Sequence, residues 1–206
     1  MAAKRTTTSY ALLGLLSVQP WTTYELAKQV QRSLNWFWPR AERKLYDEPK
    51  RLAEEGLATA MKEQQGKRPR TVYEITDKGR DALRDWLGAP PAPRALEFEG
   101  MVKVFFADGG SLDQLVETLN AIEAEAVERL ADLAEMAAAR PLTFPERGHI
   151  SALSMQLHLA QEQAILRWAR WAKDEVAQWE SARDPGEWDW NAVLVDLAKS
   201  AARAQT

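Results

Sequence analysis

The chemistry most evident in this sequence is that of clustered cations. A stretch that begins at Phe37, FWPRAERKLYDEPKRLAEEGLATA, carries five basic side chains: Arg40, Arg43, Lys44, Lys50 and Arg51. On a helix, with 100° per residue, the first three of these share one stripe with Asp47, opposite the apolar side chains. Arginine can pair with guanine, and any cation can contact a phosphate, although such a stripe is also typical of a solvated helix face.

Other candidates for contact with a polyanion lie before, within and after that stretch. The start of a helix at Thr22, Thr23 and Tyr24 could offer backbone N–H groups to a phosphate. Tyr46 could stack on a base, donate to a phosphate or be buried. A turn with the sequence QQGKRP and its flanks supply flexible cations that could follow a groove wall: Lys62, Lys67, Arg68 and Arg70.

The charge of the 206-residue chain is unevenly distributed. Residues 1–93 carry 16 Lys and Arg against 11 Asp and Glu, whereas residues 94–206 carry 11 against 19. A basic first half joined to an acidic second half suggests that the first half meets a polyanion. Chance variation in solvated surface charge could give the same totals, so charge alone does not show that the first half binds a polyanion.

Several classes of protein are disfavoured by what the sequence lacks. The absence of cysteine removes disulfides, thiol nucleophiles and Cys-type zinc sites, and it fits a reducing cytoplasm. No apolar run approaches the roughly 18 to 20 residues that span a membrane, and the N-terminus lacks the apolar region of a secretory signal. The sequence contains no glycine-rich phosphate loop and no G-x-S-x-G elbow. We therefore expect a cytoplasmic protein with no catalytic residues, no metal site and no cofactor.

A boundary between two domains is expected where the chain reads GAPPAPRA, at 88–95. Three prolines and a glycine cannot continue a helix, and the sign of the charge changes there. We place the boundary near Pro93, with one domain over residues 1–93 and a second over 94–206.

The first domain is predicted to combine four helices with a β-hairpin. Capping and turn signals give, in chain order, helices at 9–17, about 23–34 and about 39–55, a hairpin from 57–63 and 71–76, and a helix from 77 to about 87. Leu45, Leu52 and Ala53 form the apolar stripe of the third helix. This order is that of a winged helix-turn-helix, in which the third helix enters the DNA major groove and the hairpin wing lies along the backbone.

The second domain is predicted to contain two long antiparallel helices and a short final one near 193–202. A capping box at Ser111 opens the first long helix, whose apolar positions recur every three or four residues: Leu112, Leu115, Leu119, Ile122, Ala126, Leu130 and Leu133. The second covers 148–180, with these candidate buried positions: Ile150, Leu153, Leu157, Ala160, Ala164, Trp168, Trp171 and Trp179. Two such helices bury too little core alone, so we expect a second copy of the chain to complete it. The alternative is that they fold back on each other and on the first domain.

The span from about Tyr10 to Leu87 resembles the PadR family of transcriptional regulators. The matching segments are ALLGLLS, PWTTYEL, FWPRAERKLY, RLAEEGLA and GKRPRTVYEITDKGRDAL. The stretch from MVKVFFADGG onward is similar to the family's longer helical dimerisation region. The chain departs from the family at Ala41, Arg43, Asp47 and Pro49, and a proline in a helix interior predicts a kink there.

The resemblance implies a fold class that is mainly α with a small β-hairpin wing, a winged helix-turn-helix followed by an antiparallel long-helix dimerisation domain. It also implies a sequence-specific DNA-binding regulator, a homodimeric repressor on an inverted repeat that a small aromatic effector releases. Flat indole walls suit such a ligand, so we name Trp168, Trp171 and Trp179 as effector-binding candidates; the alternative is that they fill a dimer core. The rival functions are a helical adaptor, which leaves the basic wing unexplained, and an enzyme.

Overall fold

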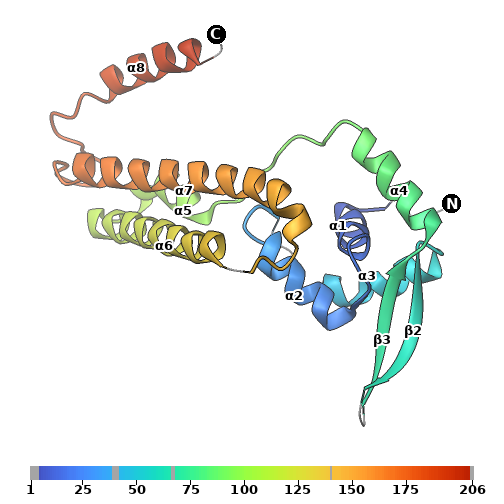
Figure 1. The fold of residues 1–206 in the computed structure, drawn as a ribbon. Helices are drawn as coiled ribbons and strands as arrows, with labels where there is room; N and C mark the ends of the chain where they lie inside the picture. Colours follow the sequence, from blue (N-terminus) through green and yellow to red (C-terminus); the bar gives the residue numbers. More distant parts are fainter. Residues whose placement is uncertain (1–4, 39–41, 66–67, 140, 205–206) are drawn as a thin grey trace. The chain divides into compact units, whose positions relative to one another are not determined.

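The computed structural model describes residues 5–38, 42–65, 68–139 and 141–204, and the chain divides into two compact units, Met1–Arg94 and Ala95–Thr206. The elements of the first unit are, in chain order, α1 Thr7–Leu16, β1 Trp21–Thr22, α2 Thr23–Ser33, α3 Glu42–Glu54, β2 Ala58–Gln65, β3 Arg68–Ile75 and α4 Asp77–Gly88. The strands β2 and β3 form an arm that projects from the helices of this unit (Figure 1). This arrangement confirms the predicted winged helix.

The short strand β1 was not expected from the sequence. It adds to the hairpin in the antiparallel order β1-β3-β2, with Trp21 opposite Tyr73 and Thr22 opposite Val72. The indole Nε1 of Trp21 also donates to the carbonyl oxygen of Leu15, 3.0 Å away. Because β1 directly precedes α2, this pairing fixes the start of α2 beside the base of the wing.

The core of the first unit is built from leucines on three helices together with apolar residues of the hairpin. Its fully buried leucines are Leu12, Leu13, Leu16, Leu26, Leu45, Leu52 and Leu57, and Val30, Ile75 and Tyr73 pack beside them. Each such leucine contributes about 1.5–3 kcal/mol by leaving water. The apolar stripe predicted for the third helix is therefore correct.

Helix α3 continues through Pro49, whose side chain is fully buried. The proline has no N–H to donate to the carbonyl of Leu45, which weakens the helix at that turn. Whether the axis bends there stays a prediction. The helix ends at Glu54, and Gly56 follows with a φ of 71°, in the left-handed region that glycine adopts without strain.

The first turn of α4 is packed tightly against the start of the hairpin. The hydroxyl of Thr76 accepts from the N–H of Gly79 at 3.1 Å and donates to the carbonyl of Gly56 at 2.8 Å. The N–H of Thr76 donates to the carbonyl oxygen of Leu57 at 3.1 Å. A Cβ added to Gly79 would lie 2.1 Å from that same oxygen, so only glycine fits here.

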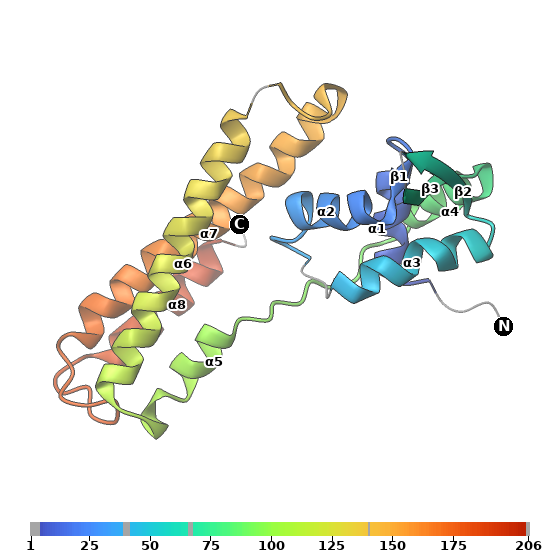
Figure 2. The same ribbon diagram turned by 90° about the horizontal axis from the view of Figure 1, so that it is seen from below.

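The second unit is formed by helices, with α6 and α7 lying side by side along most of their lengths (Figures 1 and 2). Its elements are α5 Glu99–Phe105, the 3-10 turn η1 Ala107–Gly109, α6 Leu112–Ala138, the 3-10 turn η2 Pro145–Arg147, α7 Gly148–Val176 and α8 Trp190–Arg203. Helix α5 was not predicted. Within the described residues, no helix has both the length and the apolar character needed to cross a membrane.

The face of α7 that packs against α6 differs from the predicted one. Most of the expected stripe is exposed in the single chain: Ile150 by 47%, Leu153 by 72%, Leu157 by 57% and Trp171 by 40%, with Ala160 and Ala164 also exposed and Trp168 half-buried. The buried positions are instead His158, Glu162, Ala169, Ala172 and Val176. The spacing was recognised correctly, but a single α6 can cover only one side of α7. The helix also ends at Val176, so Trp179 lies beyond it.

A buried polar pair lies within that contact between α6 and α7. His158 and Glu162 are each 5% exposed, with Nε2 of the imidazole 3.5 Å from Oε1 of the carboxyl. Arg129 of α6 approaches the same oxygen at 3.6 Å. Burial raises the pKa of Glu162 and lowers the pKa of His158, so both shifts favour the uncharged forms. Burial therefore disfavours a full ion pair between these two side chains.

Candidate functional site

The start of α2 is closed by a capping box that leaves two backbone amides for a ligand. The hydroxyl of Thr22 accepts from the N–H of Glu25 at 3.2 Å, and Oε2 of Glu25 accepts from both the N–H and the hydroxyl of Thr22 at 2.8 Å. Of the four N–H groups that a helix start leaves unbonded, the box engages two. Those of Thr23 and Tyr24 remain, and the Tyr24 side chain is 64% exposed. These groups can contact a phosphate.

Arg70 of the wing lies close enough to this helix start to act on it electrostatically. Hydrogen bonds from Thr22 hold the pKa of the Glu25 carboxyl below its usual range; burial opposes them, and the charge of Arg70 lowers the pKa a little further. The guanidinium of Arg70 also pairs across the hairpin with Glu63, with Nη2 2.9 Å from Oε2. The structure thus brings Arg70 together with the candidate residues of α2.

The candidate residues of the third helix and the wing tip are described only in part. Arg40 and Lys67 lie outside the described residues. For Arg43, Lys44 and Arg68 the description ends at the backbone, which lies in α3 for the first two and in β3 for the third. The side chains of Tyr46 and Lys50 are described, and both are exposed on α3. They are four residues apart, so they lie on the same side of that helix.

Arg51, the last cation of the basic stretch, is held within the fold. Its Nη2 donates to the hydroxyl of Ser9 in α1 at 2.7 Å and to the carboxylate of Glu48. The hydrogen bond that Arg51 donates to Glu48 raises the pKa of Arg51 against the effect of burial. Arg5 completes the group by pairing with Glu55 at 3.1 Å. Arg51 therefore ties α3 to α1.

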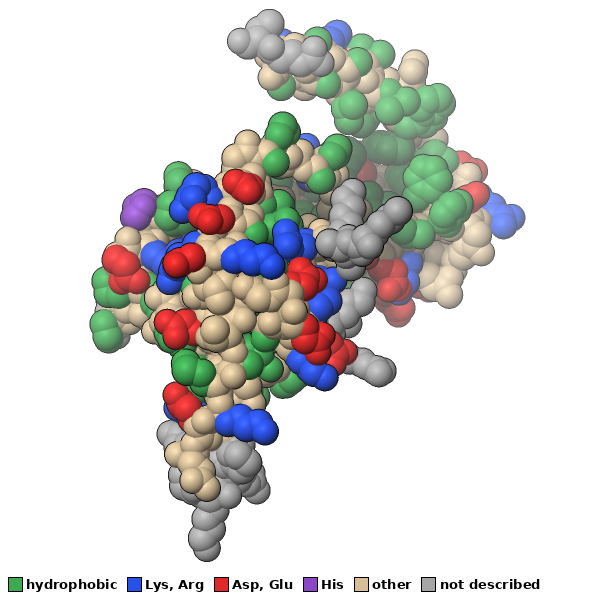
Figure 3. All heavy atoms as spheres, turned by 90° about the vertical axis from the view of Figure 1, so that its right-hand side faces the viewer, with side chains coloured by type: hydrophobic (Ala, Val, Ile, Leu, Met, Phe, Trp, Pro, Cys, Tyr) green, Lys and Arg blue, Asp and Glu red, His purple; other side chains and the backbone are tan. Residues whose placement is uncertain are grey.

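Positive charge does not form one continuous patch on the face of the first unit in Figure 3. Over the residues described there, Lys and Arg side chains alternate with Asp and Glu. Several of the cations are paired, as Lys50 is with Glu54 at 3.8 Å and Arg84 is with Asp81 at 2.7 Å. Both pairs are exposed, so each contributes little to stability and can exchange its carboxylate for a phosphate.

The three tryptophans named as effector-binding candidates line one hollow of the second unit. Its volume is about 410 Å³, and Trp188, which was not among the effector-binding candidates, forms another wall. The rings of Trp179 and Trp188 lie 5.2 Å apart at 44°. Trp168 and Trp179 pack on a floor of buried residues: Leu115, Leu119, Ala172 and Val176. The hollow thus offers several flat aromatic surfaces beside an apolar base.

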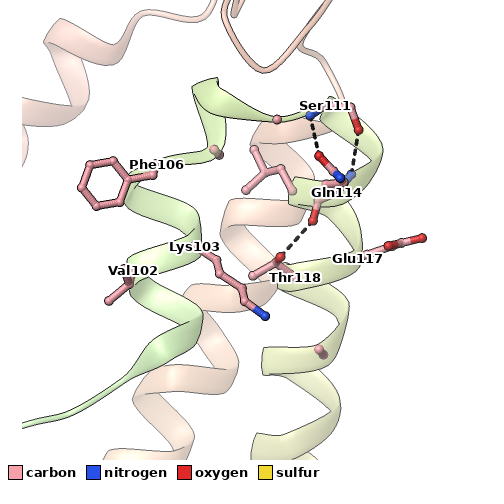
Figure 4. Close-up of a pocket in the computed structure, with 11 residues that line it drawn as sticks. Val102, Lys103, Phe106, Ser111, Gln114, Glu117 and Thr118 are labelled. Carbon is pink, nitrogen blue, oxygen red and sulfur yellow. Dashed lines mark hydrogen bonds between the residues drawn. The ribbon is translucent and has the colours of Figure 1, made fainter.

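A larger hollow of about 630 Å³ lies between α5 and α6 (Figure 4). Several of its polar groups bond to one another: the N–H of Ser111 donates to Oε1 of Gln114 at 2.9 Å, and the hydroxyl of Thr118 donates to the carbonyl of Gln114 at 2.8 Å. Lys103 pairs with Glu99 at 3.2 Å. These groups cap and stabilise helices. Among the described residues, no group of three or more His, Asp or Glu side chains is placed to hold a metal ion.

A winged helix followed by a unit of long helices defines this chain as a winged-helix regulator. Residues 12–85 match the family model described as transcriptional regulator PadR-like family, and residues 99–177 match the model described as virulence activator alpha C-term. The negative transcriptional regulator PadR of Bacillus subtilis is 30% identical over 168 residues, which cover 77% of this chain and 91% of that protein. The chain belongs to the PadR-like family of transcriptional regulators, which confirms the resemblance of its motifs.

Solved structures of the same relative share the fold of both units. Bacillus subtilis PadR in complex with operator DNA has a TM-score of 0.71 at 26% identity, covering 83% of this chain and 98% of that chain. The same protein in complex with p-coumaric acid has a TM-score of 0.62 at 26% identity, covering 84% of this chain and 99% of that chain.

Proposed function

We propose that this chain is a transcriptional repressor that binds operator DNA as a homodimer in the cytoplasm and is released by a small aromatic effector. The observation that carries the proposal is the likeness, over 83% of the chain, to a relative whose structure includes operator DNA. That relative's complex with p-coumaric acid supports control by a small aromatic ligand. The proposal gives the chain no catalytic role.

The proposed DNA contacts belong to residues 1–93 and come from three places. Arg43 and Lys44 of α3, together with Arg40, would contact base edges, with Tyr46 and Lys50 contributing from the same helix. The amides of Thr23 and Tyr24, next to Thr22, would bind one phosphate. Lys67, Arg68 and Arg70 of the wing would follow the backbone, with Arg70 exchanging Glu63 for a phosphate.

Residues 94–206 are proposed to hold the dimer contact and the effector site. The exposed stripe of α7 supports the first assignment, because isolated apolar side chains at this spacing are what a second helix covers. Trp168, Trp171 and Trp179 support the second, since they line one hollow. In a twofold dimer the two copies of the third helix are related by the twofold axis. The operator should therefore be an inverted repeat.

The spacing of the two half-sites tests this proposal. Footprinting on the DNA upstream of the chain's own coding sequence would first locate an operator. Half-sites on one face of the duplex lie about 10–10.5 base pairs apart or a multiple of that. Inserting five base pairs should therefore reduce binding toward the nonspecific level, and inserting ten should restore part of it. Unchanged affinity after the five-pair insertion would show that the two heads act independently.

A further inference from the structure

The tryptophan hollow is acidic as well as aromatic. Asp108 of η1 and Glu175 of α7 contribute carboxylates to its lining, and none of its described lining residues is basic. The indoles come from α7 and from the segment that follows it. An aromatic ligand in this hollow would therefore lie between π faces and within reach of two negative charges.

Three cations from α7 and the segment after it are engaged by groups other than the two carboxylates of the hollow. Arg170 and Lys173 of α7 both pair with Glu123 of α6, at 2.8 Å and 2.7 Å. The Nε–H of Arg183 donates to the main-chain carbonyl of Asp108 at 2.7 Å. This bond does not involve the carboxylate of Asp108. Among the described residues, neither Asp108 nor Glu175 is part of an ion pair.

We infer that this hollow binds a planar aromatic cation. Indole faces attract cations more strongly than any other aromatic side chain, and carboxylates add to that attraction. A volume of about 410 Å³ is within the range of small-molecule sites, which begins near 300 Å³. A carboxylate ligand, such as the p-coumaric acid bound by the Bacillus subtilis relative, would meet two like charges here. The inference rests on the proposed function, because it specifies the class of effector.

Calorimetric titration of the full chain, without DNA, would measure the preference directly. Three probes share one ring size and differ in charge: N-methylquinolinium is a cation, 1-naphthalenemethanol is neutral and 1-naphthoate is an anion. We expect the cation to bind at least about tenfold more tightly than the anion, with the neutral probe between them. Equal or tighter binding of 1-naphthoate would overturn the inference, as would the absence of binding by any probe at millimolar concentration.

Matched substitutions show whether the preference comes from the hollow. Glu175→Gln should lower the ratio of cation to anion affinity about threefold to tenfold. Asp174→Asn removes the same charge from the neighbouring position of α7, outside the lining, and should leave the ratio unchanged. Equal effects of the two variants would assign the preference to the net charge of the unit and overturn the inference.

Trp171→Ala distinguishes a ligand from a second copy of the chain. The side chain is 40% exposed, so its loss is compatible with folding, and all three probes should bind more weakly. If the variant instead becomes monomeric in sedimentation while the wild-type dimer binds no probe, a second copy occupies the hollow and the inference fails. A gel shift on the operator, run in parallel without probe, tests the proposed function by itself.

Discussion

Gly79→Ala should strongly destabilise the first unit. The new Cβ would lie 2.1 Å from the carbonyl oxygen of Leu57, well inside the 3.0 Å below which real Cβ atoms are essentially not found. The obstacle is backbone and cannot rotate away, so α4 and the base of the hairpin must separate. Overpacking of this kind costs about 1–3 kcal/mol, and loss of the hydrogen bond from Thr76 to the same oxygen adds about 1 kcal/mol.

A total of about 3 kcal/mol corresponds to a fall in Tm of about 12–24 °C for a unit of this size. Differential scanning calorimetry of the full chain would measure it. The matched control is Gly14→Ala in α1, where a Cβ would meet nothing within 4 Å. Alanine is the better helix former by about 0.8–1 kcal/mol, so this variant should melt at a slightly higher temperature. If Gly79→Ala melts at the wild-type temperature, the close packing of α4 against the hairpin is refuted.

Three further variants test the wing, the exposed stripe and the buried carboxyl. Arg70→Ala should weaken binding to all duplex sequences alike and reduce the slope of log K against log salt by about 0.9, which a filter-binding series would show. Leu157→Glu should turn the dimer into a 23.3 kDa monomer in sedimentation, whereas Gln156→Glu, exposed on the same helix but off the stripe, should remain dimeric. Burial raises the pKa of Glu162 above its usual value of 4.5, so just above that pH the folded state still holds a proton that the unfolded state has released. This carboxyl therefore lowers the free energy of unfolding as pH rises above about 4.5. Glu162→Gln should lack that decline, and its Tm relative to wild type should increase with pH; a constant difference in Tm from pH 4 to 7 would contradict the assigned burial effect.

Local interactions were the features best predicted from the sequence. The capping boxes at Thr22 and Ser111 depend on side chains three residues apart, so the sequence alone locates both helix starts. Strand β1 was missed because it has two residues and its partner, centred on Tyr73, is far along the chain. A two-residue strand has no periodicity to recognise.

Which face of a helix is covered depends on tertiary structure, and this explains the error on α7. The stripe through Leu153 and Leu157 has the spacing of a buried seam, but spacing does not say which partner covers it. Likewise, the sequence analysis named three of the tryptophans that line the hollow, whereas the place of Trp188 depends on the turn at Asp184 and Gly186. The charges of the hollow, from Asp108 and Glu175, come from segments far apart in sequence.

If a second copy covers the exposed stripe on α7, the stability and DNA binding of the protein depend on its own concentration. A protomer alone leaves Leu153 and Leu157 in water, so its stability would rise with the concentration of its own copies. At low copy number, separated protomers would be the forms most open to proteolysis. Operator occupancy would then increase with a power of copy number greater than one. As the repressor is diluted, for example during rapid growth, repression by a dimer would be lost over a narrower range of repressor concentration than repression by a monomer.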